Sequence, residues 1–339
     1  MKLGILGAGH IAETMAKTVH QMQKAGQGHV ELYAVASRNM ERAQQFAKQN
    51  GVEKAFGSYE EMLCDSALDI VYVATPHSHH SQHMKLCIQH GKHVLCEKAF
   101  TGNAAQAAEV LQLAKERGVL VTEAIWTRYQ PMRKIIYDLV WSGIVGTPTT
   151  LTANLAYAIS DKERLKQPDL AGGALLDIGI YGLNFAEMVF DRPDGVHATC
   201  IKTDTGVDRQ ESVTLTWEDG RMAVITSSIC GISDRKGIIY CTKGFFIVEN
   251  INNPQSITAY DTNYQVVQHV DCPPQLTGYE YEVLEAERAL AEGKTECASM
   301  PHADTLHMME LMDEIRRQFG VRYPFDDTDC IVNSAVYSM

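Results

Sequence analysis

Two stretches of the chain carry charged and phenolic side chains at a spacing that suits acid–base chemistry. In the first, Glu97 and Lys98 follow an apolar run, 94–96, that predicts a buried strand. Asn103 is a good N-cap for a following helix, so we expect Lys98 just past the carboxyl end of a strand. Ligands bind at that edge of an open α/β sheet. The alternative is a solvated Lys98 paired with Glu97.

The second stretch is a glycine-rich helix predicted over residues 172–190. It has glycine at positions 172, 173, 179 and 182, and each costs roughly 1 kcal/mol relative to alanine inside a helix. We therefore expect another element to pack very closely against it. Asp177 and Tyr181 are four residues apart and share a helix face, which predicts a polar wall for a substrate. The alternative is a core tyrosine and a capping or solvated aspartate.

A glycine loop near the start of the chain predicts a dinucleotide site beside Lys98. The short strand 2–6 runs into the sequence Gly-Ala-Gly-His-Ile-Ala, and residues 11–23 have helical spacing. Gly7 permits a tight turn, Gly9 lets backbone approach a pyrophosphate, and Ala12 permits close helix–strand packing. An ordinary tight turn between a strand and a helix is the alternative.

The end of the second strand, 30–36, favours NADP over NAD. An acidic residue usually bonds the ribose hydroxyls of NAD there, whereas this chain has Ser37 and Arg38. Arginine can bind a 2′-phosphate with two hydrogen bonds and stack on adenine. The alternative is NAD, with Arg38 only solvated at the start of a helix.

A histidine-rich turn follows the third clear strand, 69–74, at the expected edge of the cofactor site. Pro76 fixes an extended turn, and histidines stand at 77, 79, 80 and 83. No cysteine or acidic residue stands at a recognised ligand spacing from them, so we expect hydrogen bonding near the cofactor and no metal.

The order of elements predicts two domains. Strands and helices alternate to residue 123, which predicts a Rossmann domain, a doubly wound α/β fold with a parallel sheet, over 1–123. From 149 onward, strands follow one another with short turns between them, and the helix at 172–190 interrupts them. Residues 124–339 are therefore expected to form an α+β domain with a large, mostly antiparallel open sheet.

Composition excludes several classes of protein. The net charge of −12 and the lack of a dense Lys/Arg block argue against nucleic-acid binding. No apolar run approaches the roughly 20 residues of a membrane span. The nine cysteines are scattered and contain no Cys-x-x-Cys, which fits reduced thiols in the cytoplasm.

The motifs together resemble the glucose–fructose oxidoreductase / inositol dehydrogenase (Gfo/Idh/MocA) family over nearly the whole chain. The matching features are the glycine loop, Thr75-Pro76 with His80, Glu97-Lys98 and the stretch 172–181. The stretch 123–128 and Tyr181 are most similar to the subgroup of dimeric trans-1,2-dihydrodiol dehydrogenases and D-xylose dehydrogenases. Ala99 stands where the family has proline.

The resemblance implies a set of site residues. Tyr181 would be the acid/base and Lys98 the cation that favours its phenolate, or the two roles would be exchanged. Asp177 would hold a substrate hydroxyl or orient Lys98, and Trp126 and Arg128 would close the pocket. The loop 159–170 would select the substrate. The residues implied to bind the cofactor are Gly7, Ala8, Gly9, His10, Ile11, Ser37, Arg38, Thr75, Pro76, His80, Glu97 and Lys98.

We therefore expect an NADP-preferring oxidoreductase that transfers hydride to or from a sugar, polyol or cyclic trans-diol. The alternatives are a non-catalytic NADP(H) sensor and a glycosidase of the same family that uses a transient hydride. The family also implies a homodimer or homotetramer formed through the second sheet.

Overall fold

The computed structural model describes residues 1–326, which form two compact units. One unit comprises Met1–Tyr129 together with Gln275–Met309. The other comprises Gln130–Pro274 together with the described residues from Glu310 onward. Residues 327–339 of the predicted second domain lie outside the described residues.

The first unit contains a parallel six-stranded sheet in the order β3-β2-β1-β4-β5-β6. The strand order reverses at β1, between β2 and β4, which is where a doubly wound sheet binds its ligand. The predicted Rossmann architecture is confirmed. The strands are β1 (Lys2–Leu6), β2 (Glu31–Ala36), β3 (Lys54–Phe56), β4 (Ile70–Val73), β5 (His93–Glu97) and β6 (Val121–Ala124).

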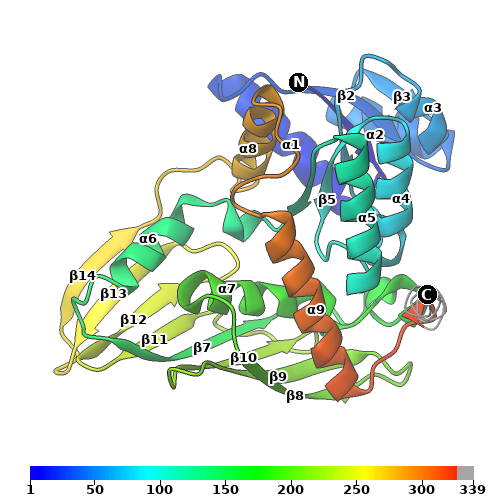
Figure 1. The fold of residues 1–339 in the computed structure, drawn as a ribbon. Helices are drawn as coiled ribbons and strands as arrows, with labels where there is room; N and C mark the ends of the chain where they lie inside the picture. The colour runs from blue at the N-terminus through cyan, green and yellow to red at the C-terminus, as the bar shows by residue number, and fades with distance from the viewer. Residues whose placement is uncertain (327–339) are drawn as a thin grey trace. The chain divides into compact units, whose positions relative to one another are not determined.

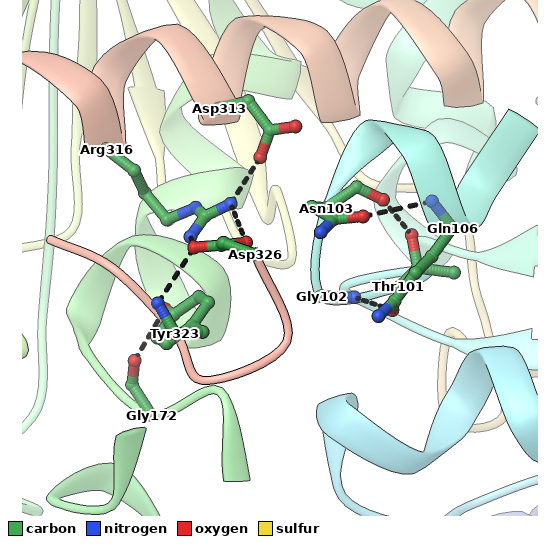
Figure 2. Close-up of polar contacts among 9 residues, drawn as sticks. All are labelled: Thr101, Gly102, Asn103, Gln106, Gly172, Asp313, Arg316, Tyr323 and Asp326. Carbon is green, nitrogen blue, oxygen red and sulfur yellow. Dashed lines mark hydrogen bonds and ion pairs between the residues drawn. The ribbon is translucent and has the colours of Figure 1, made fainter. Parts of the chain in front are cut away.

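Side-chain caps and left-handed glycines set the bounds of the helices of this sheet. Asn103 accepts a hydrogen bond from Gln106 N at 2.9 Å, and Thr101 Oγ1 donates to Asn103 O at 2.7 Å (Figure 2). Figure 1 shows α4 and α5 side by side along the sheet. The helices are α1 (His10–Ala25), α2 (Met40–Asn50), α3 (Tyr59–Leu63), α4 (His77–Gln89), α5 (Ala104–Arg117) and the 3₁₀ turn η1 (Trp126–Arg128).

The segment Gln275–Met309 packs with the first unit, whereas the sequence assigned it to the second domain. It holds α8 (Glu280–Ala291), and α9 (His302–Phe319) begins in it. Glu287 Oε1 accepts from His29 N at 2.8 Å, and His302 Nε2 lies 2.8 Å from Val121 O. Helical periodicity shows that one face of α8 is buried, but it does not show which partner buries it.

The second unit contains an eight-stranded sheet in the order β14-β13-β12-β11-β7-β10-β9-β8. The β7–β10 pair is parallel and the other pairs are antiparallel, as expected for a mostly antiparallel sheet. Figure 1 shows α6 (Pro131–Val140) and α7 (Ile180–Phe190) along one face of it. The strands are β7 (Pro148–Ala156), β8 (Gly195–Lys202), β9 (Asp208–Thr216), β10 (Met222–Ser228), β11 (Gly237–Cys241), β12 (Gly244–Glu249), β13 (Ser256–Asp261) and β14 (Val266–Asp271).

The glycine-rich segment is not the single regular helix that the sequence predicted. A π-helical turn, η4 (Leu175–Gly179), precedes α7, because the segment is held directly against the sheet. A Cβ on Gly182 would lie 2.5 Å from Ile225 Cγ2 of β10, and one on Gly179 would collide with Glu211 of β9. The expectation that another element packs very closely against these glycines is confirmed.

Pro168–Phe190 also corrects the statement that no apolar run approaches the length of a membrane span. By length and composition this stretch could cross a membrane, and it is the one such helix within residues 1–326. Its apolar window is 94% buried inside the protein, which is typical of a core helix.

The close approach of α7 to β10 predicts that Gly182→Ala destabilises the protein. Alanine gains about 1 kcal/mol of helix propensity, but the collision with Ile225 costs about 1–3 kcal/mol through overpacking. We expect a lower urea midpoint for Gly182→Ala, and a smaller loss in an Ile225→Ala background. The control is Gly231→Ala, where a Cβ meets nothing within 4 Å. A Gly182→Ala protein more stable than wild type would contradict the packing argument.

Candidate active site

The glycine loop after β1 has the geometry that a pyrophosphate requires. Gly7 has φ +105°, and a Cβ there would lie 2.9 Å from Ala74 O. Gly9 is the N-cap of α1 without a side-chain cap, and a Cβ there would meet nothing within 4 Å. The first amide groups of α1, beginning at His10 and Ile11, therefore border open space. These residues fit a dinucleotide.

Positive charge gathers at the end of β2. Arg38 is exposed beside the buried Ser37. Arg42, in the first turn of α2, donates from Nε and Nη2 to Ala8 O at 3.2 and 2.8 Å. Burial raises the pKa of the nearby Tyr59 phenol, while the charges of Arg38 and Arg42 act to lower it. Two guanidinium groups thus stand at the edge where the sequence placed a 2′-phosphate.

Two histidines after β4, His79 and His83, are hydrogen-bonded, and burial lowers the pKa of each imidazole. Burial lowers the pKa of His83 to about 4, and its Nδ1 lies 2.9 Å from Thr75 Oγ1. His79 Nδ1 lies 2.9 Å from Ser78 Oγ. Within residues 1–326, no group of three His, Cys, Asp or Glu side chains is arranged to hold a metal ion.

His80 joins the turn after β4 to the turn after β5. It is fully buried, and its Nε2 lies 2.7 Å from Thr75 O while its Nδ1 lies 2.9 Å from Ala99 O. Burial lowers its pKa to about 4, so the imidazole is neutral near pH 7. His80 therefore couples the Thr75-Pro76 turn to the Lys98-Ala99 turn.

Lys98 lies directly past the carboxyl end of β5, as predicted. It is half-buried, and its peptide bond to Ala99 is cis. Glu97 Oε2 accepts from Lys98 N at 3.2 Å, and the buried Tyr72 phenol donates to Glu97 Oε1. The backbone of Lys98 is thus held by a buried carboxylate that Tyr72 also binds.

The turn after β6 is also well buried. Trp126 stacks on Tyr279 with ring centroids 4.1 Å apart, so Tyr279 covers one face of its indole. Arg128 is 4% exposed, and its Nη1 lies 3.1 Å from Asp304 Oδ2. Glu123 accepts from Phe100 N at 3.1 Å, and burial raises its pKa to about 7.

Asp177 and Tyr181 belong to the second unit. Asp177 lies in the π-helical turn, is 5% exposed, and its Oδ1 is 2.9 Å from Arg164 Nη2. Tyr181 lies in the first turn of α7 and is 8% exposed. Both side chains are thus held within the glycine-rich segment, close to the loop that was expected to select the substrate.

The sequence analysis missed three residues, two near the expected cofactor site of the first unit and one beside the glycine-rich segment of the second unit. Arg42, Tyr72 and Arg164 each act through a partner distant in the chain. The signal for Arg42 was a second arginine in the first turn of the helix that begins just after Arg38. Neither periodicity nor a local motif indicated Tyr72 or Arg164.

The parallel sheet with its glycine loop defines a dinucleotide-binding Rossmann domain, and sequence comparison identifies the family. Residues 1–125 match the profile described as the oxidoreductase family with an NAD-binding Rossmann fold, GFO_IDH_MocA. Residues 134–247 match the GFO/IDH/MocA C-terminal domain. The chain belongs to the Gfo/Idh/MocA family, and the resemblance stated from its motifs is confirmed.

Individual relatives cover nearly the whole chain. A trans-1,2-dihydrobenzene-1,2-diol dehydrogenase from Danio rerio is 34% identical, over 96% of this chain and 99% of that protein. A D-xylose 1-dehydrogenase (NADP(+)) from Hypocrea jecorina is also 34% identical, over 96% of this chain and 93% of that protein. The structure of a 3-ketoreductase from Actinomadura kijaniata, solved with NADP and TDP-benzene, matches with a TM-score of 0.84 at 22% identity. The match covers 95% of this chain and 99% of that chain. This last match shows the shared fold.

The buried Glu123 carboxyl predicts a pH-dependent stability. Its pKa is about 7 when folded against 4.5 for an ordinary glutamate, so the folded protein holds the proton more tightly. Stability should therefore fall as pH rises from 4.5 to about 7, by on the order of 3 kcal/mol from this group. Glu123→Gln should remove that loss and be more stable than wild type at about pH 8.

Urea unfolding between about pH 5 and about pH 8 measures this difference. Glu53→Gln, at an exposed glutamate, is the control and should follow wild type. If the free energy of unfolding of wild type changed with pH in the same way as that of Glu123→Gln, the raised pKa of Glu123 would be contradicted.

Proposed function

We propose that the protein is an NADP-preferring oxidoreductase in which the bound nicotinamide exchanges hydride with a carbinol or carbonyl carbon of a sugar, polyol or cyclic trans-diol. One observation carries the cofactor preference. Where a domain selective for NAD has an acidic residue, this chain has Ser37 and Arg38, with Arg42 beside them. These guanidinium groups attract the 2′-phosphate of NADP. The 2′-hydroxyl of NAD, which an acidic residue usually binds, gains no such attraction.

The relatives support the substrate class. Two similar proteins carry the names of a trans-dihydrodiol dehydrogenase and a D-xylose dehydrogenase that uses NADP(+). Both names describe oxidation of a hydroxyl-bearing carbon that has a neighbouring oxygen substituent. The choice of substrate within this class is assigned to the loop 159–170, whose Arg164 binds Asp177.

The catalytic roles follow from the chemistry of the alcohol. Its hydroxyl proton must leave as the carbon is oxidised, and a positioned side chain must accept it. Tyr181 is proposed as the acid/base, with Lys98 as the cation that favours its phenolate, or with the roles exchanged. Asp177 is proposed to hold a substrate hydroxyl, with its carboxylate oriented by Arg164. Trp126 and Arg128 are proposed to line the pocket.

The oligomeric state and location are part of the same proposal. We propose a homodimer or homotetramer that uses the open sheet, a cytoplasmic location, and no nucleic-acid or membrane partner. Side chains exposed on sheet strands include Ile201 of β8 and Tyr240 of β11, at 51% and 40%. The eight cysteines in the described chain have free thiols, which is consistent with a reducing compartment.

Replacing either proposed acid/base partner should abolish most turnover. Lys98→Ala and Tyr181→Phe should each lower kcat by about 10²–10⁴, because each removes a positioned proton carrier or the cation that activates it. NADP should still bind, as measured by fluorescence titration. Lys115→Ala, at an exposed residue of α5, is the control. Wild-type turnover in both variants would remove these residues from the mechanism.

Arg38 should determine which dinucleotide binds. Arg38→Ala should weaken NADP binding by about 10- to 100-fold, because it removes a charge-assisted hydrogen bond to the 2′-phosphate, and should leave NAD binding unchanged. Titration of both cofactors against Arg38→Ala and the exposed control Arg117→Ala measures the effect. If the ratio of the dissociation constants for NADP and NAD were the same in Arg38→Ala as in wild type, the proposed role of Arg38 in cofactor preference would be contradicted.

A further inference from the structure

The start of the segment that bears Asp177 is held by two buried side chains from distant parts of the second unit. Tyr323, which is 2% exposed, donates from its phenol to Gly172 O at 2.7 Å. Asp208 of β9 is fully buried, and its Oδ2 accepts from Leu175 N at 2.6 Å. A polar tether therefore reaches the backbone on each side of Gly173.

The phenol of Tyr323 is itself fixed by an ionic cluster, which Figure 2 shows. The guanidinium of Arg316 lies 4.5 Å from the centre of the tyrosine ring. Arg316 pairs with Asp326 at 2.8 Å and with Asp313 at 2.6 Å. Asp326 Oδ2 also accepts from Tyr323 N at 2.8 Å. Burial raises the pKa of the Tyr323 phenol well above its usual value, so the phenol remains a donor.

Close packing leaves Gly172 and Gly173 little freedom to move. A Cβ on Gly172 would lie 2.7 Å from Arg164 O, and one on Gly173 would collide with the Asp208 carboxylate. Gly173 has φ +116°, a backbone angle that residues with a side chain rarely adopt. The backbone therefore enters the π-helical turn from one fixed position.

The π-helical turn makes this fixed entry important for chemistry. A π-helical turn holds more residues than an α-helical turn, and it occurs mostly as a single turn within an α-helix, frequently at a functional site. If η4 relaxed to an α-helix, the register would shift by one residue, which corresponds to a rotation of about 100°. Asp177 lies inside that turn and Tyr181 just after it, so their relative directions would change.

We infer that Tyr323, supported by Arg316 and Asp326, is a positioning residue for the reaction. It holds Gly172 so that the π-helical turn keeps its register, while Asp208 holds Leu175, the first residue of that turn. The inference deepens the proposed function and rests on it, because it assumes that Asp177 and Tyr181 act in turnover.

Tyr323→Phe tests this role, with Trp141→Phe as its matched control. Trp141 Nε1 donates to Val189 O at 2.9 Å, near the other end of α7. Each substitution removes one hydrogen bond to a backbone carbonyl of the same helical segment. At saturating NADP, Tyr323→Phe should lower kcat by about tenfold or more without changing the Kd for NADP, whereas Trp141→Phe should stay within about twofold of wild type.

Amide hydrogen exchange over residues 175–181 gives a readout that does not depend on activity. Tyr323→Phe should accelerate exchange there by about tenfold, and Trp141→Phe should not. Unchanged exchange in Tyr323→Phe, or equal effects of the two variants on kcat, would overturn the inference. So would faster exchange with wild-type kcat. If wild type turns over no sugar or diol, the proposed function fails by itself, and the exchange comparison alone decides whether Tyr323 positions the turn.

Discussion

Direct contact between a glycine-rich helical segment and the strands beneath it determines where Asp177 and Tyr181 stand. Gly179 and Gly182 leave no room for a Cβ against Glu211 and Ile225, so the helix axis lies unusually close to the sheet. The segment meets this constraint by opening one turn into a π-helix before α7 begins. Gly179 and Gly182, which are unfavourable for helix propensity, are therefore required by packing, and the acidic and phenolic side chains take their directions from that packing.

Buried polar groups at the strand ends organise the cofactor half in a similar way. His80 ties together the turns that follow β4 and β5, and Glu97 holds the backbone of Lys98 while it binds Tyr72. Burial keeps His80 neutral and raises the pKa of Glu123. Because these groups are buried, the effective dielectric constant near Lys98 is low, which strengthens its electrostatic interactions with other charges.

Local patterns predicted most elements because their signals lie within a few residues. β1 spans the predicted residues 2–6, Asn103 caps α5 as predicted, and Lys98 stands at the predicted strand end. The strand Lys54–Phe56 was missed because three residues carry too little pattern. The π-helical turn, the tether from Tyr323 to Gly172 and the packing of α8 on the first unit depend on contacts across long stretches of chain. Local sequence does not encode those contacts.

The central claim is hydride exchange between NADP(H) and a sugar or diol carbon, and a spectrophotometric screen tests it most directly. The purified protein would be incubated with NADP or NAD and aldoses, inositols or trans-diols, and with NADPH or NADH and deoxy-ketosugars, while the absorbance of the reduced nicotinamide is followed. The account predicts a change in this absorbance with at least one member of the panel, faster with NADP(H) than with NAD(H). No absorbance change with any member, from a protein that still binds NADP, would contradict it and favour a sensor.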